Sequence, residues 1–215
     1  MDATRPLRLA VLVSGGGTTL QNLIDRSRAG RMAAEVALVV ASRAGLVAEE
    51  RARRAGIPVL VLDWKSHGRA EFAKHAFDAI RATGVDLVVL GGFLHLLDIP
   101  PDFECRVINV HPSLIPAFCG KGFHGAAVHR AALDFGVKLS GCTVHFADAT
   151  YDTGPIIHQR AVPVLDDDTP ESLAARVFEA ECKALPEAID RIAAGAIRVE
   201  GRRVIHRPSD NSSQD

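Results

Sequence analysis

Asn109 and His111 lie two residues apart in an apolar run that ends at Pro112. In an extended strand, side chains at positions i and i+2 point to the same face. A carboxamide that donates hydrogen bonds would then lie beside an imidazole that gains or loses a proton near neutral pH. This pair predicts a site that stabilises and protonates an oxyanion at a carbonyl under attack. The same residues also fit a strand end with a turn-capping Asn and a surface His.

Asp152 is the residue that would complete such a site. It lies in the segment Tyr151–Pro155, whose Asp, Gly and Pro are typical of a turn, so an Asx turn is the simpler interpretation. If the fold brings Asp152 next to His111, the carboxylate would orient the imidazole. It would also raise the pKa of His111 above its ordinary value of ~6.5.

A glycine-rich loop follows the first apolar run of the chain. Ser14, three glycines and two threonines precede an amphipathic segment. Glycines let backbone N–H groups approach an anion, and the N-terminus of the following helix adds partial positive charge. The loop lacks the Gly-Lys-Ser/Thr of a Walker loop, and Leu20 stands where a dinucleotide fingerprint ends in glycine. We expect a phosphate site here, with a tight strand-to-helix turn as the alternative.

The elements that must position these residues alternate along the chain. Apolar runs predict strands and 3.6-residue periodicity predicts helices. The expected strands cover 7–13, 36–41, 58–62, 85–90, 106–110, 143–147 and 155–164. One helix is expected directly after residue 17, and four further helices are expected over 47–56, 69–83, 126–135 and 170–194. Strands at 197–199 and 204–205 would form a terminal hairpin. The pattern indicates an α/β fold with a Rossmann-like, doubly wound, mostly parallel sheet and helices on both faces. We expect one domain over 1–207 and a disordered polar tail over 208–215.

Bulk composition excludes several functional classes. Among 215 residues, 47% are hydrophobic and 24% charged, and the net charge is -1, which disfavours a dedicated nucleic-acid or membrane-surface binder. No run approaches the roughly 20 apolar residues of a membrane span. The four cysteines form no C-x-x-C pair and the nine histidines form no ligand ladder, so we expect reduced thiols and no metal. The run at 7–13 does not read as a signal peptide, which favours a cytoplasmic protein.

Five motifs, taken together in order, carry a resemblance to a known family. From about Leu7 to Arg207 the chain resembles the glycinamide ribonucleotide formyltransferases, which are folate-dependent. The motifs are Val11-Leu12-Val13-Ser14-Gly15-Gly16-Gly17, Gly91-Gly92-Phe93-Leu94, Ile108-Asn109-Val110-His111-Pro112-Ser113-Leu114-Ile115-Pro116, Gly141-Cys142-Thr143-Val144-His145-Phe146 and Tyr151-Asp152-Thr153-Gly154-Pro155-Ile156-Ile157.

The resemblance implies transfer of a formyl group from 10-formyltetrahydrofolate to the amine of 5-phosphoribosyl-glycinamide. The amine would attack the formyl carbon directly, without an enzyme nucleophile. Asn109 would donate to the oxyanion, charged His111 would stabilise or protonate it, and Asp152 would support His111 and assist proton movement. These three are the expected catalytic residues.

The resemblance also implies two binding sites. The ribonucleotide would contact Gly17, Thr18, Thr19, His129 and Glu181. The folate would contact Arg69, Leu94, His95, Leu96, Leu97, Asn109, Asp148, Ala149, Thr150, Tyr151 and Asp152. We expect these small molecules to be the partners of a monomer or weak homodimer.

The chain departs from the family pattern at three places. Thr19 stands where the family usually has Asn, and His95 where it often has Arg. The segment from Phe118 to Gly125 is longer and more basic than usual; we expect it to be a plain loop, with extra contacts from Lys121 and His124 as the alternative.

The competing functions either use the formyl group with a different acceptor or involve no catalysis. An amino-sugar formyltransferase would keep the reaction and change the acceptor pocket. A formyltetrahydrofolate hydrolase usually has a further domain, and a methionyl-tRNA formyltransferase would be longer with a basic surface. A non-catalytic nucleotide-binding module would use only the glycine loop and leave Asn109, His111 and Asp152 without a role.

Overall fold

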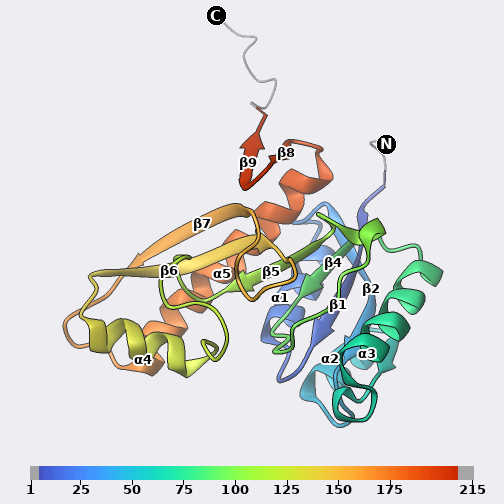
Figure 1. The fold of residues 1–215 in the computed structure, drawn as a ribbon, viewed down its shortest axis with the longest axis horizontal. Helices are drawn as coiled ribbons and strands as arrows, with labels where there is room; N and C mark the ends of the chain where they lie inside the picture. Colours follow the sequence, from blue (N-terminus) through green and yellow to red (C-terminus); the bar gives the residue numbers. More distant parts are fainter. Residues whose placement is uncertain (1–4, 208–215) are drawn as a thin grey trace, which may run out of the picture.

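A computed structural model describes residues 5–207 as a layered α/β structure around one nine-stranded sheet (Figure 1). The expected tail at 208–215 lies outside the described residues. The strands are β1 (Leu7–Val13), β2 (Ala34–Ala41), β3 (Val59–Val61), β4 (Leu87–Leu90), β5 (Val107–His111), β6 (Leu139–Phe146), β7 (Ile156–Pro163), β8 (Ile197–Glu200) and β9 (Arg203–His206). The helices are α1 (Thr18–Arg28), α2 (Val47–Arg54), α3 (Trp64–Ala82), α4 (Ala126–Phe135) and α5 (Pro170–Ala193), with a 3-10 turn at Pro101–Phe103.

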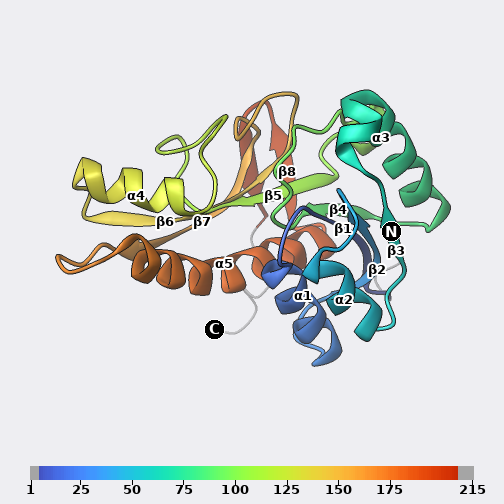
Figure 2. The same cartoon turned by 90° about the horizontal axis from the view of Figure 1, so that it is seen from below.

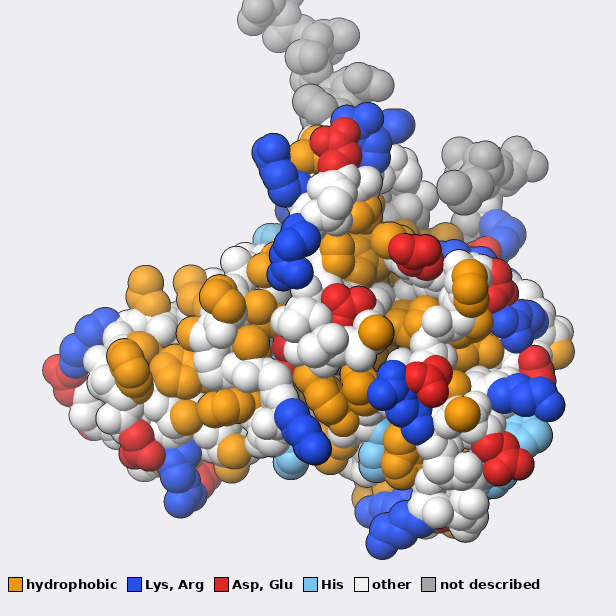
Figure 3. Space-filling model, in the orientation of Figure 1, with side chains coloured by type: hydrophobic (Ala, Val, Ile, Leu, Met, Phe, Trp, Pro, Cys, Tyr) orange, Lys and Arg blue, Asp and Glu red, His pale blue; other side chains and the backbone are white. Residues whose placement is uncertain are grey.

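The sheet has the order β3-β2-β1-β4-β5-β6-β7-β9-β8. The first five strands of this order (β3, β2, β1, β4 and β5) run parallel to one another, whereas β6 pairs antiparallel with both β5 and β7. The mostly parallel, doubly wound arrangement predicted from the sequence is therefore confirmed. The hairpin of β8 and β9 continues the sheet beyond β7 and stands out from the body of the molecule (Figures 1 and 3).

The strand order reverses between β1 and β4, because the chain first adds β2 and β3 on one side of β1 and then crosses to the other. Ligands of doubly wound sheets bind beyond the carboxyl ends of the strands at such a point. The loops that follow β1 and β4 meet there, since the Ser14 N–H donates to the Gly92 carbonyl at 3.2 Å. This crevice is where the fold places the glycine-rich loop.

Two apolar cores cover the two faces of the sheet. One contains Leu20, Leu23, Leu173 and Leu185, and thus seats α1 and α5. The other contains Phe72, Phe77 and Ile80 of α3. Figure 2 shows α3 on one side of the sheet and α1, α2 and α5 on the other. No helix within residues 5–207 has the length and apolarity needed to cross a membrane.

Two element boundaries differ from the sequence prediction by four residues or more. Helix α3 begins at Trp64 rather than Arg69, because Asp63 caps the early turn by accepting the Ser66 N–H at 2.9 Å. Gly68, with φ 71°, then interrupts the helix, which explains why apolar periodicity becomes regular only beyond it. Strand β6 begins at Leu139 rather than Thr143, since it pairs with β7 along its whole length.

Candidate active site

Strands β5 and β6 bring the two central side chains together. Asn109 and His111 lie two residues apart on β5. On the neighbouring strand β6, Asn109 pairs with His145 and His111 pairs with Thr143. The run that predicted the strand is buried, and His111 itself is only 4% exposed. The period-2 expectation that both side chains share a space therefore agrees with the local structure.

Asp152 joins these residues from the loop between β6 and β7. Its Oδ2 lies 3.5 Å from Nδ1 of His111, and its Oδ1 accepts a hydrogen bond from Nδ2 of Asn109 at 3.4 Å. The carboxylate is nearly buried, with 8% of the side chain exposed. The fold thus brings together the three residues expected to be catalytic.

Backbone contacts hold Asp152 in place. Its Oδ2 accepts the Gly120 N–H at 2.8 Å, and the residue adopts a left-handed conformation with φ 57°. Asp is among the residue types that tolerate this region best. Two residues later, Gly154 passes so close to the Phe146 carbonyl oxygen that a Cβ would lie 1.8 Å from it. Glycine is required at that crossing, which ties the loop to the end of β6.

The site sets the protonation of His111 differently from the sequence expectation. Burial lowers the pKa of His111 below 6.5, and it outweighs Asp152 and the Phe118 carbonyl, both of which favour the charged ring. Burial alone would raise the pKa of Asp152, but the rings of His145 and His111, when either is protonated, and the hydrogen bond from the Gly120 N–H hold it below its ordinary range. The predicted upward shift of His111 is thus wrong, because desolvation exceeds the attraction of one carboxylate.

The His111 ring of the unliganded protein should titrate below ~6.5 in an NMR pH titration. Asp152→Asn should lower the midpoint further, because the replacement removes the charge that favours the imidazolium. Since the folded-state pKa lies below the unfolded one, His111 stabilises the fold above about pH 6.5, and this contribution is lost as the pH falls. A wild-type midpoint above 6.5 would contradict the proposed dominance of burial.

A cavity of about 270 Å³ opens on one side of His111. Thr19 of α1, His129 of α4 and Glu181 of α5 line it, so three of the five residues expected to hold the ribonucleotide meet there. Gly17 and Thr18 lie beside it at the start of α1, where Gly17 adopts φ 72° as the residue before the helix. The α1 N-terminus favours an anion at this end of the cavity.

Two lining residues of this cavity have unusual polar environments. His129 is buried, its Nδ1 has no hydrogen-bond partner among the described residues, and burial followed by the nearby His111 lowers its pKa. Burial raises the pKa of Glu181 to about 7. Each offers a polar atom to a bound molecule, which is what a pocket for a hydroxyl-rich ligand needs.

Glu181→Gln should stabilise the unliganded protein at alkaline pH. The folded-state pKa lies above the unfolded value of 4.5, so the wild type loses stability as the pH rises from there to about 7. Because Glu181 lines a cavity and the residue is only partly buried, we expect a gain of roughly 1 kcal/mol at pH 8, or about 2–4 °C in Tm. Ribonucleotide affinity should fall about tenfold.

Thermal unfolding at pH 5 and pH 8 checks this expectation, with Glu179→Gln on the exposed face of the same helix as the control. The gain should be present at pH 8, small at pH 5 and absent in the control. Equal Tm values for wild type and Glu181→Gln at pH 8 would refute it.

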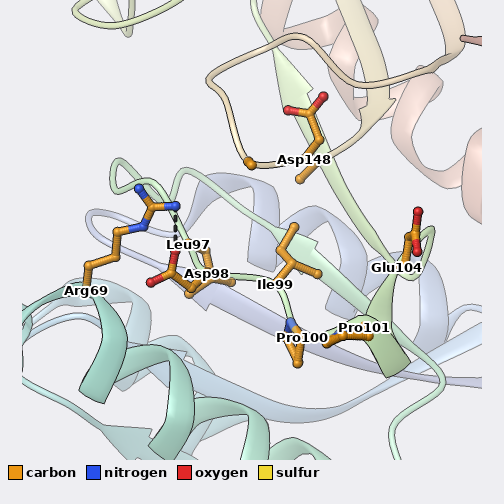
Figure 4. A pocket seen from close by; sticks show the side chains of 10 residues that line it. Arg69, Leu97, Asp98, Ile99, Pro100, Pro101, Glu104 and Asp148 are labelled. Carbon is orange, nitrogen blue, oxygen red and sulfur yellow. Dashed lines mark ion pairs between the residues drawn. The ribbon is translucent and has the colours of Figure 1, made fainter.

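A second cavity, of about 40 Å³, lies on the other side of the trio. Most of the residues expected to contact folate line it, namely His95, Leu96, Leu97, Asn109, Asp148, Thr150, Tyr151 and Asp152. It continues through Leu97 and Asp148 into a larger cavity of about 370 Å³ that Arg69 and Ala149 line. Figure 4 shows Arg69 directed toward Asp98, with which it forms an ion pair, and both residues line this larger cavity.

Two members of the expected folate strip behave differently. Leu94 lines the cavity of Thr19 and Glu181, because the chain turns at Gly92 and directs Leu94 away from the strip. His95 stacks on Trp64 with ring centroids 4.3 Å apart, and burial lowers its pKa. A neutral ring therefore occupies the position where the family often has a cation.

The segment from Phe118 to Gly125 does more than the plain loop that we expected. The Phe118 carbonyl contacts Nε2 of His111 at 3.0 Å, the Gly120 N–H binds Asp152, and His124 lines the cavity of Glu181. Lys121 lines none of the cavities described above. Sequence reasoning gave no role to His145, although it lies in the fourth motif, because its pairing with Asn109 across β5 and β6 could not be read from the sequence. No group of three or more metal-binding side chains occurs among the described residues.

Comparison with known proteins identifies the family. A family model described as "Formyl transferase" matches residues 7–189. The chain belongs to the formyl transferase family. The crystal structure of glycinamide ribonucleotide transformylase 1 from Symbiobacterium toebii is 43% identical to this formyl transferase, with a TM-score of 0.87 and coverage of 96% of each chain. The resemblance noted in the sequence is therefore confirmed.

Curated relatives of this formyl transferase are longer proteins. The trifunctional purine biosynthetic protein adenosine-3 of Gallus gallus is 42% identical over 199 residues, which cover 91% of this chain and 19% of the relative. The chloroplastic phosphoribosylglycinamide formyltransferase of Vigna unguiculata is 39% identical over 191 residues, which cover 87% of this chain and 61% of the relative. The formyl transferase thus spans between about a fifth and three fifths of these two relatives.

Proposed function

We propose that this formyl transferase moves the formyl group of 10-formyltetrahydrofolate to the amine of 5-phosphoribosyl-glycinamide, a step of purine synthesis. The observation that carries the proposal is the position of Asn109, His111 and Asp152 between two cavities. One cavity adjoins the helix terminus suited to a phosphate, and the other is lined by the strip expected to hold the folate. The names of the relatives, a glycinamide ribonucleotide transformylase and a phosphoribosylglycinamide formyltransferase, support the same acceptor and the transfer of a formyl group to it.

The proposed reaction needs no enzyme nucleophile. The amine attacks the formyl carbon, a C–N bond forms, and the carbonyl oxygen becomes an oxyanion that accepts a hydrogen bond from Asn109. Collapse of this intermediate breaks the bond to the folate nitrogen, which takes a proton as it leaves. Preorganised donors at the oxyanion supply much of the acceleration in such reactions.

His111 carries the proton in this scheme. Because the ring starts neutral near pH 7, it accepts the proton that the amine loses, and Asp152 stabilises the resulting imidazolium at 3.5 Å. The charged ring then protonates the oxyanion or the leaving nitrogen. This assignment retains the expected role of charged His111 but makes the charge a product of the first step.

Initial rates with the wild-type protein test the function. Formylated ribonucleotide should appear when 10-formyltetrahydrofolate and 5-phosphoribosyl-glycinamide are supplied, with kcat/KM higher than for an amino-sugar nucleotide. A preference for the amino sugar would assign the acceptor differently. Release of formate at the same rate without any amine would make the protein a formyltetrahydrofolate hydrolase.

We also propose that residues 1–207 act as one domain, in the cytoplasm, as a monomer or weak homodimer, without nucleic acid or membrane as a partner. Four free cysteines support a reducing compartment. Charged and apolar side chains are interspersed over the face in Figure 3, as on an ordinary solvent-exposed surface. Light scattering after size-exclusion chromatography tests the oligomeric state, and fractionation of cells tests the compartment.

A further inference from the structure

His145 is a buried polar residue to which the proposed mechanism assigns no role. It lies on β6 directly opposite Asn109 and is 2% exposed. Its Nε2 is 3.2 Å from Nδ2 of Asn109 and 3.6 Å from Oδ1 of Asp152. The ring thus touches two of the three residues expected to be catalytic, and it lines the same 40 Å³ cavity as they do.

The partner of the other ring nitrogen determines which atom carries a proton. Nδ1 of His145 lies 2.8 Å from the Phe146 carbonyl oxygen, which can only accept a hydrogen bond. Nδ1 therefore carries a proton, and in the neutral ring Nε2 is an acceptor. The N–H of Asn109 is the donor that meets this acceptor within hydrogen-bond distance.

The same contacts fix the orientation of the Asn109 carboxamide. If the amide were reversed, its oxygen would face Nε2 of His145 and also lie 3.4 Å from the Asp152 carboxylate. Two acceptors would then oppose each other in a buried site, which is unfavourable. With the nitrogen inward, one N–H binds His145 and the other binds Asp152. The longer of these contacts is the one that an incoming oxygen can replace.

We propose that His145 is a positioning residue that holds the Asn109 carboxamide so that an N–H, and not the C=O, meets the formyl oxyanion. The inference rests on the proposed function, because it concerns the oxyanion formed in that reaction. His145 keeps the first N–H of Asn109 throughout. The second N–H passes from Asp152 to the formyl oxygen, and Asp152 is then free to stabilise His111.

Two substitutions separate the two contacts of His145. Asn reaches about as far as Nδ1, so His145→Asn keeps the donor to the Phe146 carbonyl and loses the acceptor for Asn109. Gln reaches about as far as Nε2, so His145→Gln keeps an acceptor for Asn109 and loses the other contact. We expect kcat to fall about ten- to a hundredfold in His145→Asn, with both KM values little changed, and to stay within about threefold in His145→Gln. Equal kcat values in the two variants would overturn the proposal.

A double-mutant cycle distinguishes positioning from a general structural role. In an Asn109→Ala background, His145→Asn should lower kcat by less than about twofold, because no carboxamide is left to orient. A full additional loss in that background would overturn the proposal.

A third measurement does not depend on turnover. Nitrogen-15 NMR of the unliganded wild-type protein should show the Nδ1–H tautomer of His145, and the Nε2–H tautomer would overturn the assignment. If the wild type formylated no glycinamide ribonucleotide, the proposed function would fail, and this spectrum would still decide which ring nitrogen of His145 carries the proton.

Discussion

Asp152→Asn should lower kcat/KM for formyl transfer by about a hundred- to a thousandfold. The carboxylate accepts the Gly120 N–H at 2.8 Å and faces His111 at 3.5 Å, so it is positioned to stabilise the imidazolium formed during attack. The amide has the same shape but no charge. Asn also tolerates the left-handed backbone at this position, so the fold should survive the change. Steady-state rates with each substrate varied in turn measure the loss.

Two comparisons distinguish a catalytic effect of Asp152→Asn from a loss of stability or of surface charge. The Tm of Asp152→Asn should stay within a few degrees of the wild type, because the backbone conformation is preserved. Asp166→Asn is a matched control, since Asp166 is 91% exposed and pairs with Lys138 at the surface. It should leave kcat/KM unchanged. Turnover of Asp152→Asn equal to that of this control would remove Asp152 from the catalytic residues.

Gly154→Ala should destabilise the protein by about 3 kcal/mol or more, which is roughly 6–12 °C in Tm for a chain of this size. A Cβ there would lie 1.8 Å from the Phe146 carbonyl oxygen, and neither atom can rotate away, because the Cβ is bonded directly to Cα and the carbonyl is part of the backbone. The same carbonyl holds the His145 ring at 2.8 Å. Turnover should therefore fall together with stability.

Gly15→Ala provides the control for the backbone effect. Nothing lies within 4 Å of a Cβ at Gly15, and its φ is not left-handed, so Ala should be accommodated there. Thermal unfolding of both variants under one condition makes the comparison. A Tm for Gly154→Ala as high as that for Gly15→Ala would mean that the loop shifts without penalty.

Local pattern was sufficient to predict the elements that carry the chemistry. Five apolar runs in the first half of the chain became five parallel strands, because a strand buried on both faces needs a continuous apolar sequence. The two-residue spacing placed Asn109 and His111 together, since the period of a strand is fixed by its geometry. Asp152 was different: its proximity to His111 depends on a long-range loop, and only the resemblance to a family pointed to it.

The errors arose where packing between distant segments decides the outcome. The pKa of His111 depends on how many atoms from other segments desolvate the ring, and the sequence around it contains no measure of that. His145 was quoted within a motif but given no role, because its partner Asn109 is 36 residues away across the β5–β6 pair. The role of the loop from Phe118 to Gly125 could not be predicted, because its contacts with His111 and Asp152 come from backbone atoms, which any sequence provides.

The two cavities beside the trio have no lining residue in common. A molecule held by Thr19 and Glu181 does not fill the space that Leu96 and Tyr151 enclose. Both substrates can therefore be bound at the same time, and the formyl group can pass directly from the folate to the amine. The kinetics should be sequential, with intersecting rather than parallel double-reciprocal plots, and the formyl group should at no stage be attached to the protein.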